Sequence, residues 1–288
     1  MMETTTDNTN HTEFFREYTA QEAILKYSRT TAGFGISYLL EHDYKTVYLD
    51  ALALLPRELK QRGVRLLDFG CGAGMNLIHL VSTLSRDGIR VAKAVGTDFS
   101  PVLIDAAKRE ARSQLGGEQQ TKIEFHVAKN ETLIEDLCMA SNTNRAGLKG
   151  SFDFILGVNT IRYCHRAGTE LDCAHDILDL LAPGGLCVVI DMNDRFLFFR
   201  NTWRNRLRGQ RENEALSYLP SLEEYSASFR KVGFQVLRSE NFCWIPHSSG
   251  PVMCRMLSAI SWLLNGLIRS RAMRSLVIAR RPVSVDSR

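Results

Sequence analysis

The sequence predicts an α/β protein built on a mostly parallel sheet. Short apolar runs, too short to be helices, alternate with segments in which apolar residues recur at helical spacing. The first run, residues 64–69, stops at three closely spaced glycines, and a helix-like segment follows. The second run ends in Asp98. Strands and helices that alternate in this way form parallel sheets with right-handed crossovers.

Composition restricts the class of protein. The 288 residues can bury a large core, and 44% hydrophobic with 24% charged residues is usual for a soluble globular chain. The net charge of +4 is far below that of most nucleic-acid binders, so we expect no nucleic-acid partner. Seven scattered cysteines without a C-x-x-C pair indicate buried, reduced thiols in a cytoplasmic protein, with neither a disulfide framework nor a metal site.

The N-terminal part precedes the first strand and differs from the rest in pattern. Residues 1–12 are polar, without the pattern of a signal peptide, and we expect them to be disordered. Residues 13–60 read as at least two helices separated near Gly33 and Gly35, and we expect them to form an N-terminal helical cap. Tyrosines in this cap either pack in a core or line a substrate pocket. We assign Tyr27 and Tyr38 to the pocket.

The main domain, residues 61–288, contains the remaining elements. The predicted strands are 64–69, 91–98, 123–128, 152–158, 186–194, 234–237 and 275–279. Helices begin at Ser100, where a proline follows the N-cap, and at the capping box formed by Ser221 and Glu224. Two insertions are predicted, near 195–218 and 245–272. Six arginines and no acid lie in 195–211.

The glycine turn and Asp98 indicate a ligand site. Glycine permits positive φ and close approach of a ligand to the backbone. A turn of this kind between a strand and a helix is where doubly wound sheets bind nucleotides. A carboxylate at the end of the second strand is placed to accept hydrogen bonds from ribose hydroxyls. The alternative is that Asp98 only caps a turn.

Five segments together resemble the class I S-adenosylmethionine-dependent methyltransferases: LLDFGCGAG, VGTDFS, FDFILGV, LLAPGG with the strand after it, and the helix from Ser221-Leu-Glu-Glu to Val-Gly-Phe. The resemblance covers about residues 60–240 and a last strand near 275–280. It implies a Rossmann-like, seven-stranded sheet in which the last strand runs antiparallel between strands five and six. It also implies S-adenosylmethionine as the cofactor. The cofactor-binding residues that we assign on this basis are Asp68, Gly70, Cys71, Gly72, Gly74, Asp98, Phe99, Asn130 and Asn159.

The chain departs from the family pattern after the third strand. Members often have an acidic residue there that accepts a hydrogen bond from the adenine amine, whereas this chain has Lys129 and Asn130. Lysine cannot accept, so an adenine contact would depend on the Asn130 amide oxygen. After the fourth strand the chain has Asn-Thr-Ile-Arg and not Asn/Asp-Pro-Pro-Tyr/Phe. This difference argues against the branch that methylates nucleic-acid bases or protein glutamines.

The function that we predict is methyl transfer to an oxygen or nitrogen atom of a small, fairly hydrophobic acceptor. Two alternatives are a non-catalytic partner subunit with the same fold and an NAD-type Rossmann oxidoreductase. The oxidoreductase fingerprint needs a third glycine at the position of Met75. The intact glycines and Asp98 argue against the partner subunit.

Residues expected on the acceptor side follow strands four, five and six. His165 and His247 are candidates for a general base, although a structural role is equally compatible with the sequence. The remaining residues that we assign to the substrate pocket are Tyr163, Asp191 and Asn193.

Residues 251–271 form an apolar helical segment. No uninterrupted apolar run in the chain reaches the roughly 20 residues of a membrane-spanning helix. The segment is flanked by arginines and contains no acid. We expect it to fold over the active site as a lid, and contact with an anionic membrane surface is the alternative. The apolar residues expected on one face are Met256, Ile260, Leu263, Leu264 and Ile268.

Overall fold

The computed structural model describes residues 32–196 and 219–283. The predicted disordered segment, the first part of the helical cap with Tyr27, and most of the first insertion therefore lie outside the described residues. All seven cysteines lie within them and are free, as predicted, and all but Cys138 are buried.

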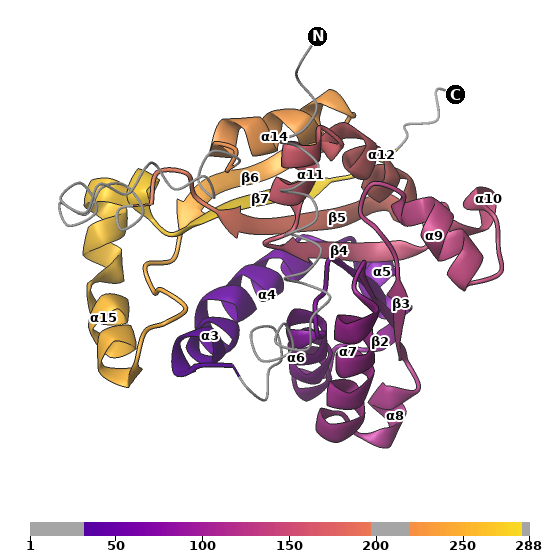
Figure 1. Cartoon of the computed structure of the whole chain (residues 1–288), viewed down its shortest axis with the longest axis horizontal. Coiled ribbons are helices and arrows are strands. Elements are labelled where there is room, and N and C mark those ends of the chain that lie inside the picture. The colour runs from indigo at the N-terminus through magenta and orange to yellow at the C-terminus, as the bar shows by residue number, and fades with distance from the viewer. Residues whose placement is uncertain (1–31, 197–218, 284–288) are drawn as a thin grey trace, which may run out of the picture.

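A seven-stranded sheet forms the centre of the described chain, with the order β3-β2-β1-β4-β5-β7-β6 (Figure 1). Only β7 runs antiparallel, and it lies between β5 and β6 as the family resemblance implies. The strands are β1 (Val64–Phe69), β2 (Val91–Asp98), β3 (Ile123–Val127), β4 (Phe152–Val158), β5 (Leu181–Met192), β6 (Gln235–Phe242) and β7 (Arg274–Arg280).

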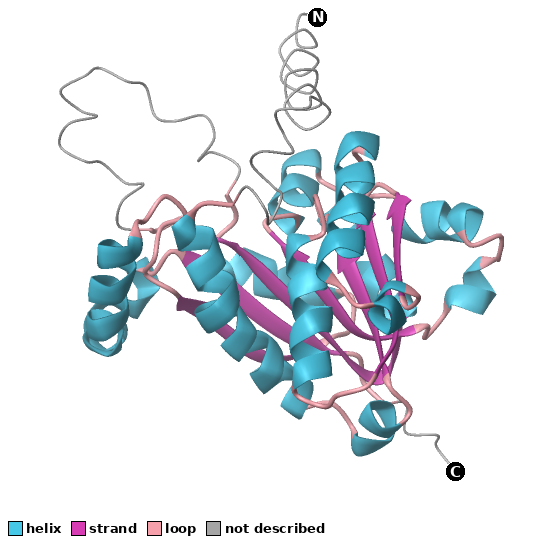
Figure 2. Ribbon diagram, turned by 90° about the horizontal axis from the view of Figure 1, so that it is seen from below, coloured by secondary structure: helices cyan, strands magenta, loops and turns pink. Residues whose placement is uncertain are grey.

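Helices cover both faces of the sheet, as Figure 2 shows. Neighbouring residues of β1 illustrate why its sequence does not alternate: Leu66 packs in the core on one face and Leu67 in the core on the other. Both faces are buried, so both sets of positions are apolar. The main covering helices are α4 (Lys45–Ala53), α6 (Met75–Arg86) and α7 (Pro101–Gln114) on the first face, and α9 (Leu133–Ala140), α12 (Glu170–Leu180) and α14 (Leu222–Lys231) on the second.

The sequence predicted a helix break at Gly33 and Gly35. Gly33 is the N-cap of the first described helix, whereas Gly35 lies inside that helix, and the described part of the cap continues without a break from there. Helix α3 (Phe34–Leu39) continues through the π-helical turn η1 (Leu40–Tyr44) into α4. Gly35 lies inside α3 because another backbone segment approaches it there: a Cβ at this position would lie 2.6 Å from the carbonyl oxygen of His247. The glycine serves close packing and not a break.

Strand β6 is longer than predicted, because it pairs with β7 along its whole length, from Gln235 opposite Arg280 to Phe242 opposite Arg274. The second insertion forms helix α15 (Pro251–Ile268) between these two strands. The remaining described helices are α5 (Arg57–Gln61), α8 (Gly117–Gln120), α10 (Arg145–Leu148), α11 (Ile161–Ala167) and η3 (Arg269–Arg271).

Candidate active site

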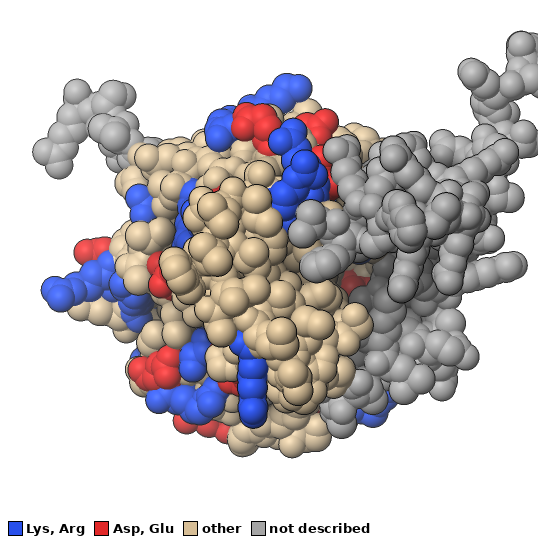
Figure 3. All heavy atoms as spheres, turned by 90° about the vertical axis from the view of Figure 1, so that its left-hand side faces the viewer, with Lys and Arg blue, Asp and Glu red and all other residues tan. Residues whose placement is uncertain are grey.

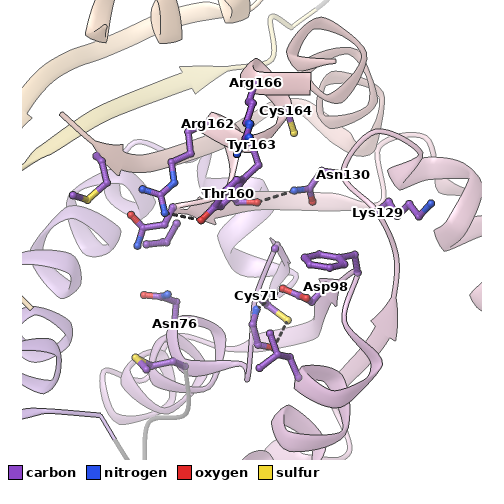
Figure 4. A pocket seen from close by; sticks show the side chains of 18 of the residues that line it. Cys71, Asn76, Asp98, Lys129, Asn130, Thr160, Arg162, Tyr163, Cys164 and Arg166 are labelled. Carbon is purple, nitrogen blue, oxygen red and sulfur yellow. Dashed lines mark hydrogen bonds between the residues drawn. The ribbon is translucent and has the colours of Figure 1, made fainter. Parts of the chain in front are cut away.

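A cavity of about 740 Å³ lies at the carboxyl ends of β1, β2 and β4. These strands are parallel, so the segments that follow them meet at one edge of the sheet. Figure 4 shows Cys71 and Asp98 on one side of the cavity, and Thr160 and Arg162 on the other. The volume falls in the range of about 300–1,000 Å³ that is usual for small-molecule sites.

The glycine turn forms part of the cavity wall. Gly70, Gly72 and Gly74 all have positive φ, at 66°, 55° and 78°. A Cβ on Gly70 would lie 2.2 Å from Oγ1 of Thr160, so the turn packs directly on the segment that follows β4. Gly70, Cys71 and Gly72 line the cavity, whereas Gly74 is not among the lining residues. The turn therefore presents backbone to the cavity.

Asp98 lines the cavity and also holds the turn. Its Oδ2 accepts a hydrogen bond from the Gly72 N–H at 2.9 Å, and its Oδ1 accepts one from the Ser100 N–H at 2.9 Å. Burial raises the pKa of Asp98, and these two N–H donors oppose that rise. A carboxylate has about four acceptor positions, so lone pairs remain for ligand hydroxyls. Turn capping and ligand binding are therefore compatible roles.

Asp68 lies behind the turn and not in the cavity wall. The Leu77 N–H in the first turn of α6 bonds to its carboxylate. The N-cap of α6 is Gly74, which has no side chain to satisfy such an N–H. Burial, followed by the nearby Asp98 charge, raises the pKa of Asp68 well above its usual value. In this geometry Asp68 positions the helix that follows the turn.

Asn130 and Phe99 line the cavity beyond β3 and β2, together with Lys129. The Asn130 side-chain nitrogen donates to Oγ1 of Thr160 at 2.7 Å, an interaction visible in Figure 4. This bond leaves the amide oxygen as the atom of Asn130 that can accept from an adenine amine. Asn159 also lines the cavity, at the end of β4.

A buried arginine that the sequence interpretation missed lies next to the cavity. Arg274 is fully buried in β7, and its guanidinium donates to Oδ1 of Asn159 and to Nε2 of His247. It also lies 2.6 Å from Sδ of Met192. All three partners line the cavity, and all are uncharged side chains. An arginine within an apolar strand was the only signal of this role in the sequence.

His247 lines the cavity, but its geometry limits its chemistry. Burial, and then the positive charges of Arg274 and Arg162, lower the pKa of His247 from 6.5 to about 2. Because Nε2 accepts from Arg274, the proton of the neutral ring is on Nδ1. A ring in this state can donate a hydrogen bond and has no free lone pair with which to act as a base.

Two other predicted residues, His165 and Tyr38, do not line the cavity. Nδ1 of His165 lies 3.4 Å from the Glu170 carboxylate on the next helix. The ring of Tyr38 packs against that of His42, with centroids 4.1 Å apart.

Asp191 and Asn193 are buried outside the lining. Asp191 accepts from the backbone N–H of Arg162 at 3.1 Å, and its Oδ1 lies 3.7 Å from Nε of that arginine. Asn193 donates to the carbonyl oxygens of Ser270, at 3.0 Å, and Ala272, at 2.6 Å. These contacts orient cavity-wall residues and join loops, and neither side chain lines the cavity.

Two arginines lie on the acceptor side of the wall. Arg162 and Arg166 line the cavity together with Tyr163, the predicted pocket residue. The Arg162 guanidinium donates to the Tyr163 hydroxyl at 2.7 Å, and its carbon lies 4.7 Å from the centre of that ring. Two further lining residues, Tyr44 and Asn76, come from the cap and from α6 and were not assigned from the sequence.

Comparison with known proteins identifies the family. Residues 40–239 match a family described as a methyltransferase domain. The chain belongs to this family. The family uses S-adenosylmethionine as its cofactor, so the NAD-type oxidoreductase alternative is rejected.

Curated relatives match a smaller part of the chain. A ubiquinone biosynthesis O-methyltransferase from Rhodopseudomonas palustris is 29% identical over 48% of this chain and 43% of its own length. A magnesium-protoporphyrin O-methyltransferase from Rhodobacter capsulatus is 30% identical over 39% of this chain and 38% of its own length. The match thus spans less than half of either relative.

Solved structures agree with the fold. A SAM-dependent methyltransferase from Aquifex aeolicus is 15% identical with a TM-score of 0.51, covering 85% of this chain and 92% of the other. One from Mesorhizobium loti is 19% identical with a TM-score of 0.51, covering 81% and 97%.

The cavity fits the family cofactor. Backbone at the glycine turn can lie against a ligand, and Asp98 retains acceptor positions for two ribose hydroxyls. Phe99 supplies an apolar wall, and Asn130 has a free amide oxygen. These are the residues that we expect to hold S-adenosylmethionine.

Proposed function

We propose that this chain methylates an ionisable oxygen, such as a phenol or enol, on a small hydrophobic acceptor. The observation that carries the proposal is the positive charge around the acceptor end of the cavity. Arg162 and Arg166 line this part of the wall, and the fully buried Arg274 lies directly behind it. A protonated amine would be repelled by these groups, whereas an acceptor oxygen that becomes anionic would be stabilised.

Apolar lining supports a hydrophobic acceptor. The side chains that supply it from the cap, α6, β4 and β5 are Ile36, Leu40, Met75, Val158 and Met192. Between them, Tyr44 and Tyr163 combine aromatic area with a directional hydroxyl. The two curated relatives are named as O-methyltransferases of ubiquinone biosynthesis and of magnesium protoporphyrin, which agrees with this substrate class.

The chemistry follows from charge and position. S-adenosylmethionine supplies an electrophilic methyl group when bound. Arg162, with Arg274 behind it, lowers the pKa of a bound hydroxyl and stabilises the oxyanion. The hydroxyl proton passes to solvent as the oxyanion forms, because Nε2 of His247 is occupied by Arg274 and cannot receive it. The remaining acceleration comes from holding the acceptor oxygen in line with the methyl group.

Isotope labelling tests this proposal. The full chain is incubated with a cell extract and S-adenosylmethionine labelled in its methyl group, and labelled products are identified by mass spectrometry. Matched pairs of aromatic compounds that differ only in a hydroxyl or an amine are then compared as acceptors. We expect label on oxygen, with kcat/KM for the phenols exceeding that for the amines at least about tenfold, which is about 1.4 kcal/mol. Labelling confined to nitrogen would contradict the proposal.

A further inference from the structure

Helix α15 lies at the edge of the molecule beside α3, at the left in Figure 1. Only Cys254 among its 18 residues is buried, in a small core with Leu39 and Ile245 against which Leu257 also packs. The indole nitrogen of Trp244 donates to Oδ1 of Asn265 at 2.8 Å. These contacts attach one side of the helix to the domain and set which side faces outward.

The outward side of α15 is apolar. Trp262 is 74% exposed and Leu267 72% exposed, values far above those of core residues. The other large apolar residues exposed on this helix are Val252, Met253, Met256, Ile260 and Leu263. Figure 3, which faces this side of the molecule, shows a broad area of uncharged residues with basic and acidic side chains at its margins. Contiguous apolar surface of this kind marks an interaction site.

The helix and the short turn after it carry charge of one sign. Residues 251–271 contain three arginines and no acidic residue. Arg269 pairs with Glu240 of β6. Within the described part of the chain no salt bridge involves Arg255 or Arg271, which stand near the two ends of the helix. Two positive charges are therefore available to an anionic partner beside the apolar area.

The lid expected from the sequence is not what the structure contains. No residue of α15 is among those that line the cavity, so its exposed apolar side does not cover the active site. The reason lies in the loop before the helix. Trp244 and Ile245 of this loop are buried, and His247 lies in the cavity wall, so the loop directs the helix away from the cavity.

Length and composition alone would allow Pro251–Arg271 to cross a bilayer, although polar residues interrupt its apolar run as noted from the sequence. The sheet argues for a different orientation. Phe242 at the end of β6 pairs with Arg274 at the start of β7, so the chain leaves and re-enters the domain at one point. A spanning helix would place its two ends on opposite sides of a core about 30 Å thick. A helix lying in the plane of the surface needs no such separation.

We propose that α15 binds the surface of an anionic membrane, with its apolar side inserted between lipid headgroups and Arg255 and Arg271 at lipid phosphates. Apolar burial and attraction of basic residues to anionic lipids act together in helices of this kind. Apolar area alone would equally suit another protein, and the one-signed charge is what favours lipid. The proposal concerns a surface outside the cavity and is independent of the acceptor.

Co-sedimentation with vesicles tests the proposal. The full chain is mixed at low salt with vesicles of phosphatidylcholine, with and without phosphatidylglycerol. We expect binding to the anionic vesicles, and a fall in the partition coefficient of about 100-fold or more in the double variant Leu263→Asp/Leu267→Asp. Arg255→Glu/Arg271→Glu should weaken binding to anionic vesicles selectively, as added salt should.

A matched control is Met139→Asp, because Met139 on α9 has the same 74% exposure as Trp262 but lies elsewhere. This variant should bind vesicles like the wild type. Thermal unfolding and cofactor affinity should be unchanged in the α15 variants, since no α15 residue lines the cavity. Binding should also shift Trp262 fluorescence to the blue, and Trp262→Phe should remove that shift.

Two results would overturn the proposal. One is equal sedimentation of the wild type and the Leu263→Asp/Leu267→Asp variant, including no sedimentation of either. The other is a wild-type dimer by light scattering that this variant converts to monomer, without vesicle binding. In that case a second copy of the chain is the occupant of the apolar side.

Discussion

Arg274 donates a hydrogen bond to Nε2 of His247, which places a buried cation directly behind a neutral imidazole of the cavity wall. Asn159 accepts from the same guanidinium. One strand residue thus positions two cavity residues that come from different loops, and this arrangement leads to the first two predictions.

Replacing Arg274 should change the pH dependence of the reaction as well as its rate. Arg274→Gln removes the charge, so the acceptor hydroxyl should ionise at higher pH, and kcat/KM should fall about 10- to 100-fold. Arg274→Lys keeps the charge and should keep the position of the pH profile better than Arg274→Gln. Steady-state kinetics across pH with a phenolic acceptor measures both effects. A loss of rate in Arg274→Gln with an unmoved profile would indicate a purely structural role.

His247 should contribute to acid sensitivity and not to the ionisation that controls activity. Its pKa is lowered from 6.5 to about 2, so the native state holds fewer protons here than the unfolded chain below about pH 6.5. The stability that His247 contributes is therefore fully present above about pH 6.5, the pKa in the unfolded chain. It is lost as the pH falls from there toward the pKa in the native state. The free energy of unfolding should therefore fall less steeply below about pH 6.5 in His247→Gln, by at most about 1.4 kcal/mol per pH unit.

Denaturant titrations of the two proteins at several pH values measure this difference. The pH profile of kcat/KM gives the contrary outcome. An inflection at about pH 6.5 in the wild type that is absent in His247→Gln would show that this histidine titrates in the working enzyme.

Gly72 should be essential for cofactor binding. A valine there would place its side chain on the cavity wall at a φ of 55°, and we expect calorimetric affinity for S-adenosylhomocysteine to fall more than about 100-fold. Gly88 is a matched control, because its φ is 72° and a Cβ there would meet nothing within 4 Å. Gly88→Val should show comparable backbone strain and nearly wild-type affinity. Unchanged affinity in Gly72→Val would reject the assignment of the turn.

Asp98 should bind the ribose in addition to capping the turn. Asp98→Ala should weaken cofactor binding by about 1.5–3 kcal/mol, the range for hydrogen bonds to a charged group. The variant also removes the acceptor for the Gly72 N–H. Ribose binding and turn capping are therefore separated by comparing two ligands, and not by the substitution alone. An analogue of S-adenosylhomocysteine without ribose hydroxyls should lose much less affinity on the substitution. Equal losses for both ligands would assign Asp98 to the turn alone.

The sequence by itself determined the sheet and the glycine turn. Strand β4 occupies 152–158 as predicted, and β1 and β2 likewise match their predicted ranges. Buried parallel strands are apolar on both faces, and a turn at positive φ selects glycine, so each feature leaves a local signal. The candidate cofactor residues follow from those signals because parallel strands end at one edge.

Only the tertiary structure decided which polar residues meet. Arg274 and Asn159 are 115 positions apart and come together because β7 inserts between β5 and β6. Asp191, predicted for the pocket, bonds instead to the Arg162 backbone once β4 and β5 pair. The apolar pattern of α15 was evident in the sequence, but the packing of the preceding loop decides that this side faces outward. A local sequence pattern shows which face of a helix or strand is apolar. What packs against that face depends on contacts between residues that are distant in the chain.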